Sequence, residues 1–128
     1  MLIFGLGFQA ILMSRLTTHV LDLAAGLPAA GLRIELHDLS VTPPHRLAEV
    51  HTNQDGRCDC PLLEGESLRG RYSLTFYVAE YFRARGVSLP EPAFFEDVVV
   101  RFGIANGDQS YPVPLLVSPW SYSTYRGS

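Results

Sequence analysis

Apolar and polar residues alternate along most of this chain, and a period of two is typical of β-strands that bury one face. The clearest run alternates Leu32, Ile34 and Leu36 with Arg33, Glu35 and His37. Similar runs begin at Leu16 and cover residues 46–51, 72–78, 98–105, 111–117 and 121–125. Turn-forming residues separate the runs. Asn53-Gln54-Asp55-Gly56 follows one strand, and Asn106-Gly107-Asp108 is expected to close a β-hairpin between the strands at 98–105 and 111–117.

One segment departs from the alternation. Residues 80–85 mix polar and aromatic side chains before Gly86, which is typical of a short helix that ends at a glycine. Pro90 and Pro92 prevent the helix from continuing. The run from Tyr72 to Val78 places its apolar side chains on one face, so we expect a central strand there. The whole pattern predicts an all-β sandwich of about seven or eight strands with one short helix.

Composition and charge narrow the class of protein. A chain of 128 residues is expected to form one domain, and 47% hydrophobic with 18% charged residues is typical of a packed globular protein. The net charge is −3, and all ten basic residues are arginine. We therefore expect no surface for nucleic acid, and chemistry that depends on a lysine is excluded.

The first twelve residues, MLIFGLGFQAIL, are apolar and differ from the rest of the chain. They are too short to span a bilayer and lack the positive start of a signal peptide, so no membrane association is expected. Because Met13-Ser14-Arg15 reads as an ordinary start, we interpret residues 1–12 as an extension or a mis-assigned start before a domain at 13–128. This interpretation predicts a cytoplasmic protein. A degenerate export signal, leading to the periplasm, is the alternative.

General catalytic and metal-binding motifs are not found in the sequence. Cys58 and Cys60 are too close for an unstrained disulfide, so both thiols are expected to be free. The histidines do not have the spacing of a zinc site; they are His19, His37, His45 and His51. We therefore expect no metal site.

Two segments near the ends of the domain carry a family resemblance. One is Leu16-Thr17-Thr18-His19-Val20-Leu21-Asp22, and the other is the C-terminal run from Leu115, which ends in Tyr125-Arg126-Gly127-Ser128. Together with the segments at 52–57 and 98–102, they resemble the 5-hydroxyisourate hydrolases, the transthyretin-related proteins of purine breakdown. The resemblance covers residues 13–128.

The resemblance implies a fold, an assembly and a reaction. The fold is a transthyretin-like β-sandwich, and the assembly is a homotetramer made of two dimers, with active sites in a channel where the dimers meet. The last strands, where Val113, Leu115 and Val117 alternate with other residues, are expected to be buried in the dimer. The reaction is the hydrolysis of 5-hydroxyisourate to 2-oxo-4-hydroxy-4-carboxy-5-ureidoimidazoline in urate degradation, without metal or cofactor.

Carried over position by position, the resemblance also implies site residues. The catalytic ones are His19, Arg57 and Ser128, and the substrate-binding ones are Tyr125, Arg126 and Gly127. Simple chemistry agrees for the first two, because a neutral imidazole can activate water at pH 7 and a guanidinium can stabilise an oxyanion.

One position departs from the family pattern. Where the family has a second catalytic histidine, within His-Tyr-His-Val-Pro-Leu-Leu, this chain has Pro112 within Ser-Tyr-Pro-Val-Pro-Leu-Leu. Proline has no titratable group and no backbone N–H. Two alternatives therefore stay open, a weak or inactive protein that binds a small ligand and a pseudoenzyme kept for assembly. The retained terminal tetrapeptide, which the carrier proteins lack, favours the hydrolase. Whether His37 or His51 substitutes for the missing histidine is not decided by the sequence.

Overall fold

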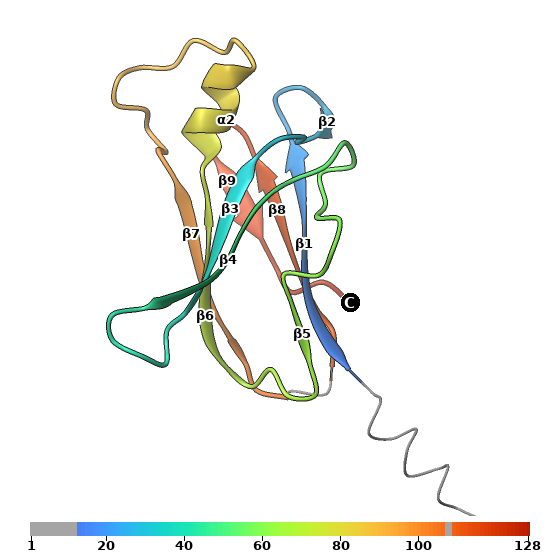
Figure 1. Cartoon of the computed structure of the whole chain (residues 1–128). Coiled ribbons are helices and arrows are strands. Elements are labelled where there is room, and N and C mark those ends of the chain that lie inside the picture. The colour runs from blue at the N-terminus through green and yellow to red at the C-terminus, as the bar shows by residue number, and fades with distance from the viewer. Residues whose placement is uncertain (1–12, 107–108) are drawn as a thin grey trace, which may run out of the picture.

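Two sheets face each other in the computed structural model, which describes residues 13–106 and 109–128 (Figure 1). The expected extension at 1–12 lies outside the described residues. Sheet A has the strand order β2 (Leu27–Pro28), β1 (Ser14–Asp22), β8 (Tyr111–Val117) and β9 (Tyr122–Thr124), and β5 (Leu63–Gly65) also pairs with β1. Sheet B has the order β4 (His45–His51), β3 (Arg33–Asp38), β6 (Gly70–Phe76) and β7 (Val98–Ile104).

The core lies between the sheets and consists of every second residue of the strands. Leu16 and Val20 in β1 and Leu115 in β8 are fully buried, and so are the alternating apolar residues of β3. The predicted all-β sandwich is therefore confirmed. Val113 and Val117 also point into this core. Their alternation is thus explained within one subunit and is no evidence of a dimer surface.

The short helix α2 (Val78–Ala84) lies at one end of the sandwich (Figure 1). Gly86 follows it with a φ of +84°, as the sequence predicted. β6 is an interior strand of sheet B, which was also predicted, but it ends at Phe76. The prediction that Val78 extends this strand is wrong, because Val78 begins the helix. Val78 is still buried, so its side chain continues the apolar pattern of the strand although the backbone has become helical.

The expected hairpin between β7 and β8 is also wrong. The two strands belong to different sheets, and the chain crosses between the sheets near Asn106. β8 pairs in parallel with β1, from Leu16 opposite Tyr111 to Asp22 opposite Val117. The predicted turn residues could not indicate which strand the following segment would join. Residues 107 and 108, on which the turn was predicted, lie outside the described residues.

The described part of the chain has nine strands, slightly more than expected. The additional ones are the short β2 and β5, which are too brief to show an alternating pattern. No helix in the described part is long and apolar enough to cross a membrane.

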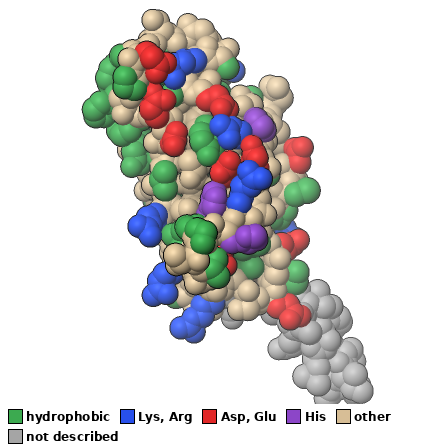
Figure 2. Space-filling view, turned by 60° about the vertical axis from the view of Figure 1, so that its left-hand side comes forward, with side chains coloured by type: hydrophobic (Ala, Val, Ile, Leu, Met, Phe, Trp, Pro, Cys, Tyr) green, Lys and Arg blue, Asp and Glu red, His purple; other side chains and the backbone are tan. Residues whose placement is uncertain are grey.

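The outer face of sheet B is strongly polar. Arg33 contacts Glu80 of α2 at 2.8 Å and lies 3.5 Å from Glu35, which in turn lies 3.6 Å from Arg46. Figure 2 shows acidic, basic and histidine side chains mixed across one side of the molecule. This face is therefore covered by ion pairs within the subunit.

Candidate active site

His19 lies on the outer face of sheet A, on the opposite side of the molecule from the ion pairs of sheet B. Its neighbours Thr18 and Val20 face the core, so the alternation turns His19 and Thr17 outward. The parallel register with β8 places Thr17 beside Pro112 and His19 beside Pro114. Pro112, which stands where the family has its second histidine, therefore lies in the strand next to that of His19 and on the same face of sheet A.

Arg57 reaches the same place from a different part of the chain. It follows the turn at 53–56 and forms an isolated antiparallel bridge with His19. The N–H of Val20 donates to the carbonyl of Gly56 at 2.8 Å, which holds the turn against β1. Gly56 has a φ of +75°, and a Cβ there would clash with the carbonyl oxygen of Val20. Only glycine allows the turn to approach the strand so closely.

The surroundings of His19 favour its neutral form. Partial burial lowers its pKa, and the positive charge of Arg57 lowers it further, while a hydrogen bond to the backbone of Asp55 and the Asp55 charge act in the opposite direction. A neutral imidazole that donates one N–H to the Asp55 carbonyl keeps its second nitrogen as an acceptor. His19 therefore has one ring nitrogen free to accept a proton.

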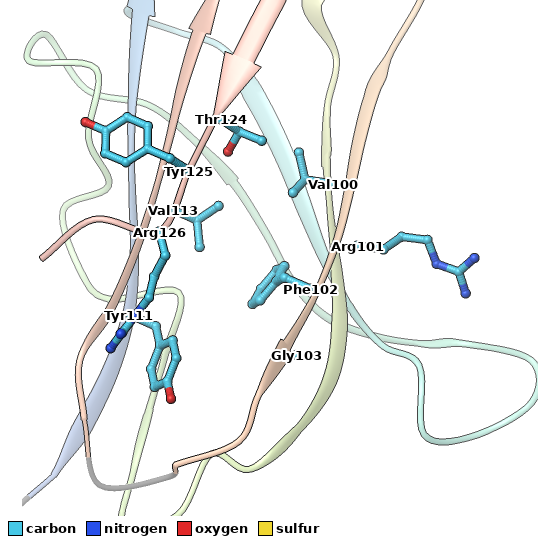
Figure 3. Close-up of a pocket in the computed structure, with 9 residues that line it drawn as sticks. All are labelled: Val100, Arg101, Phe102, Gly103, Tyr111, Val113, Thr124, Tyr125 and Arg126. Carbon is cyan, nitrogen blue, oxygen red and sulfur yellow. The ribbon is translucent and has the colours of Figure 1, made fainter.

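The C-terminal segment continues along β8 after β9 ends. The N–H of Gly127 donates to the carbonyl of Pro112 at 2.8 Å, and a Cβ on Gly127 would lie 2.9 Å from the Cβ of Pro112. The register of β9, with Thr124 opposite Leu115, places Tyr125 on the outer face. In Figure 3 the Tyr125 ring points away from Thr124. Tyr125 and Gly127 therefore share the face of His19, and Ser128 follows as an exposed terminal residue.

Arg126 points the other way. Its Nη2 donates to Oε1 of Gln109 at 3.0 Å and to the carbonyl of Ser110 at 3.3 Å, and its Cζ lies 4.4 Å from the centre of the Tyr111 ring. The side chain borders a hollow of about 280 Å³ between the two sheets, shown in Figure 3. Within one subunit, Arg126 therefore does not join the other predicted site residues.

The remaining histidines lie elsewhere. His37 of β3 turns to the outer face of sheet B, where its Nε2 is 3.8 Å from Glu35, and His51 pairs with Arg33 across β4 and β3. His45 is exposed at the start of β4. His37 and His51 therefore belong to strands of sheet B, whereas His19 and Pro112 belong to sheet A.

Two groups near His19 were not identified from the sequence, the Thr17 side chain and the backbone carbonyl of Asp55. Thr17 and Arg57 line a hollow of about 190 Å³ together with Cys58 and Cys60. Thr17 could have been found, because it is two residues from His19 in a strand and so must share its face. The Asp55 carbonyl could not, because a backbone atom leaves no signal in the residue pattern. Both cysteines are free, and burial raises the pKa of the Cys58 thiol.

Comparison with known proteins adds independent evidence. The sequence model of the HIUase/Transthyretin family matches residues 16–127. The 5-hydroxyisourate hydrolase of Pseudomonas aeruginosa is 58% identical over 117 residues, which cover 91% of this chain and 93% of that protein.

Solved structures agree with this match. The crystal structure of (S)-allantoin synthase has a TM-score of 0.86 and 46% identity, covering 93% of this chain but only 45% of that longer one. The 5-hydroxyisourate hydrolase of Klebsiella pneumoniae has a TM-score of 0.74 and 33% identity, covering 90% of this chain and 100% of that one. The sandwich, the retained end segments and these matches have one explanation: the chain belongs to the HIUase/Transthyretin family.

Proposed function

We propose that this protein hydrolyses 5-hydroxyisourate to 2-oxo-4-hydroxy-4-carboxy-5-ureidoimidazoline. The observation that carries the proposal is the pairing of His19 with Arg57 on the outer face of sheet A, beside the end of the chain at Gly127. The names of the relatives support it. A neutral base and a fixed positive charge side by side are what the opening of a cyclic acyl–nitrogen bond requires.

The reaction begins with water bound next to His19. The free ring nitrogen accepts a proton while the water oxygen bonds to an acyl carbon of the substrate ring. The carbonyl oxygen becomes negatively charged, and the guanidinium of Arg57 stabilises that charge. When the intermediate collapses, the carbon–nitrogen bond breaks and the nitrogen receives the proton from His19. One water has then been added, and His19 is neutral again.

The C-terminal residues complete the site in this proposal. Tyr125, Gly127 and Ser128 border the substrate on the His19 face, and the absence of a side chain on Gly127 leaves room above Pro112. Arg126 contributes indirectly, because its hydrogen bonds to Gln109 and Ser110 fix the terminal segment against the start of β8. No step uses a metal ion.

A homotetramer is part of the same proposal. β7 and β9 are edge strands of the two sheets, and edge strands present unpaired backbone groups to a second copy. Beside this edge, Phe94 and Trp120 are 66% and 61% exposed, with ring centres 5.8 Å apart. Pairing of edges would cover these rings in a dimer, and two dimers would enclose the His19 face. Light scattering tests this, and a stable monomer at micromolar concentration would contradict it.

Pro112 favours a second candidate, a catalytically weak or inactive protein that binds a small ligand. An ultraviolet time course of freshly generated 5-hydroxyisourate separates the two. We expect the purified protein to accelerate the decay above the spontaneous rate, equally with and without a chelator. Decay identical to that in buffer would refute the hydrolase, and loss of activity with the chelator would refute a reaction that needs no metal.

A further inference from the structure

We propose that Asn53 is a positioning residue that places His19 and Arg57 together for the reaction. The inference rests on the proposed function, since it concerns the same site. Asn53 itself lies in the turn before Arg57 and does not line the hollow that Thr17 and Arg57 border. Its effect must therefore pass through the backbone of the turn.

Four hydrogen bonds within the turn converge on Asn53. Its side-chain Oδ1 accepts from the N–H of Asp55 at 2.9 Å and from the N–H of Arg57 at 3.1 Å. Its own N–H donates to the carbonyl of Arg57 at 2.7 Å, and its carbonyl accepts from Gly56 at 2.9 Å. One side-chain oxygen thus holds the two residues that act on His19, because Asp55 supplies the carbonyl for the imidazole and Arg57 supplies the charge.

The side chain of Asn53 is itself oriented by a partner. Its Nδ2 donates to Oδ1 of Asp59 at 3.0 Å, so the amide oxygen must point back into the turn. Both ends of the turn are anchored. Thr52 is buried and bonds to Leu32, the residue directly before β3, and Gly56 bonds to β1. Between these anchors, Asn53 is the side chain that sets the shape of the loop.

This arrangement predicts a defined effect on His19. The charged groups that act on the imidazole are Arg57 and Asp55, and partial burial under the turn acts with Arg57 to lower its pKa. If the turn loosens, burial and the Arg57 charge weaken together with the Asp55 hydrogen bond. Because the net effect of these influences is a lowered pKa, their loss moves the pKa upward toward its ordinary value of 6.5.

The first test compares the Asn53→Ala variant with the wild-type protein. We expect kcat/KM to fall about 100-fold, since small displacements of catalytic groups have effects of that order. We also expect the acid limb of the pH–rate profile to move to higher pH. Gln54→Ala is the matched control, because Gln54 is exposed in the same turn and its side chain makes no hydrogen bond within the described residues. It should leave rate and profile unchanged.

A reciprocal exchange tests the hydrogen bonds themselves. Asn53→Asp keeps the acceptor oxygen but faces the carboxylate of Asp59, whereas combining it with Asp59→Asn restores a donor and acceptor pair at the same total charge. We expect the double variant to recover most of the rate lost in Asn53→Asp. Failure to recover any of it would overturn the proposal.

Two outcomes separate positioning from a merely structural role. If Asn53→Ala only unfolded part of the protein, the smaller active fraction would lower the apparent kcat and leave the acid limb of the pH–rate profile in place. That result would overturn the inference. NMR titration of the His19 imidazole gives a readout that does not depend on turnover. If the unchanged chain had no activity, the proposed function would fall, but the same upward shift of the His19 pKa in Asn53→Ala would still support the positioning role. An unmoved pKa would refute it.

Discussion

Replacing Pro112 with histidine tests the one departure from the family pattern. The side chain at 112 lies on the outer face beside Thr17, two residues along β1 from His19. With about 3.3 Å per residue along a strand and about 4.8 Å between strands, the Cα atoms of positions 19 and 112 are about 8 Å apart. Two imidazoles at that spacing can flank one small ring between them, so Pro112→His should add a second acid or base to the site.

The expected gain is large. A positioned acid or base contributes about 10²- to 10⁴-fold, equivalent to about 3 to 5 kcal/mol of barrier. Because the site was formed without this histidine, we expect at least about a 10-fold increase in kcat/KM. Gly127 favours the fit, since it has no side chain to collide with the new ring.

Stability should change little in this variant. The Gly127 N–H already donates to the Pro112 carbonyl. A histidine at position 112 would add a backbone N–H, and one more hydrogen bond from that group would contribute about 0.5 to 1.5 kcal/mol. Removing a proline frees the unfolded chain, which costs about 0.4 to 1 kcal/mol. The two contributions nearly offset each other, so a changed rate would not reflect a changed fraction of folded protein.

The assay is the decay of 5-hydroxyisourate followed in the ultraviolet, with urea unfolding of each variant. Pro112→Ala is the control that removes the proline without adding an imidazole, and its rate should not rise. His19→Ala should remove most activity with either residue at 112. An unchanged rate in a folded Pro112→His variant would show that another group already fills the role. Full activity in His19→Ala would show that the base is misassigned.

Three further predictions concern single contacts. The lowered pKa of His19 should place the acid limb of the kcat/KM profile below pH 6.5, and Arg57→Ala should move the limb upward in a pH-rate series. Gly56→Ala must adopt a φ of +75°, so urea unfolding should show a loss of at least about 1 to 2 kcal/mol, with reduced activity. Tyr81→Phe removes a 2.9 Å hydrogen bond to the buried carboxylate of Asp22, and the same unfolding assay should show a loss of about 1.5 to 3 kcal/mol.

Local pattern alone located most of the long strands and showed which of their side chains face outward, although it missed β2 and β5 and extended β6 to Val78. Alternation with a period of two depends on neighbouring residues only, so it located β3, β6 and β7. The same rule could also have shown that Thr17 shares the face of His19. The glycine after the helix is equally local, because the left-handed conformation of Gly86 suits few other residues. The family pattern of the two end segments and of residues 52–57 added the identity of the candidate residues.

Only the tertiary structure decided which segments meet. β8 pairs with β1 and not, as the sequence had suggested, with β7, and this pairing places Pro112 on the same outer face as His19. The antiparallel course of the chain end along β8 gave Arg126 its partners, because it brought the guanidinium to the Tyr111 ring and to Gln109. Val78, which the pattern assigned to a strand, begins the helix and is nevertheless buried in the core. Strand pairing joins residues far apart in sequence and is selected by the packing of both sheets together, so no local period contains it.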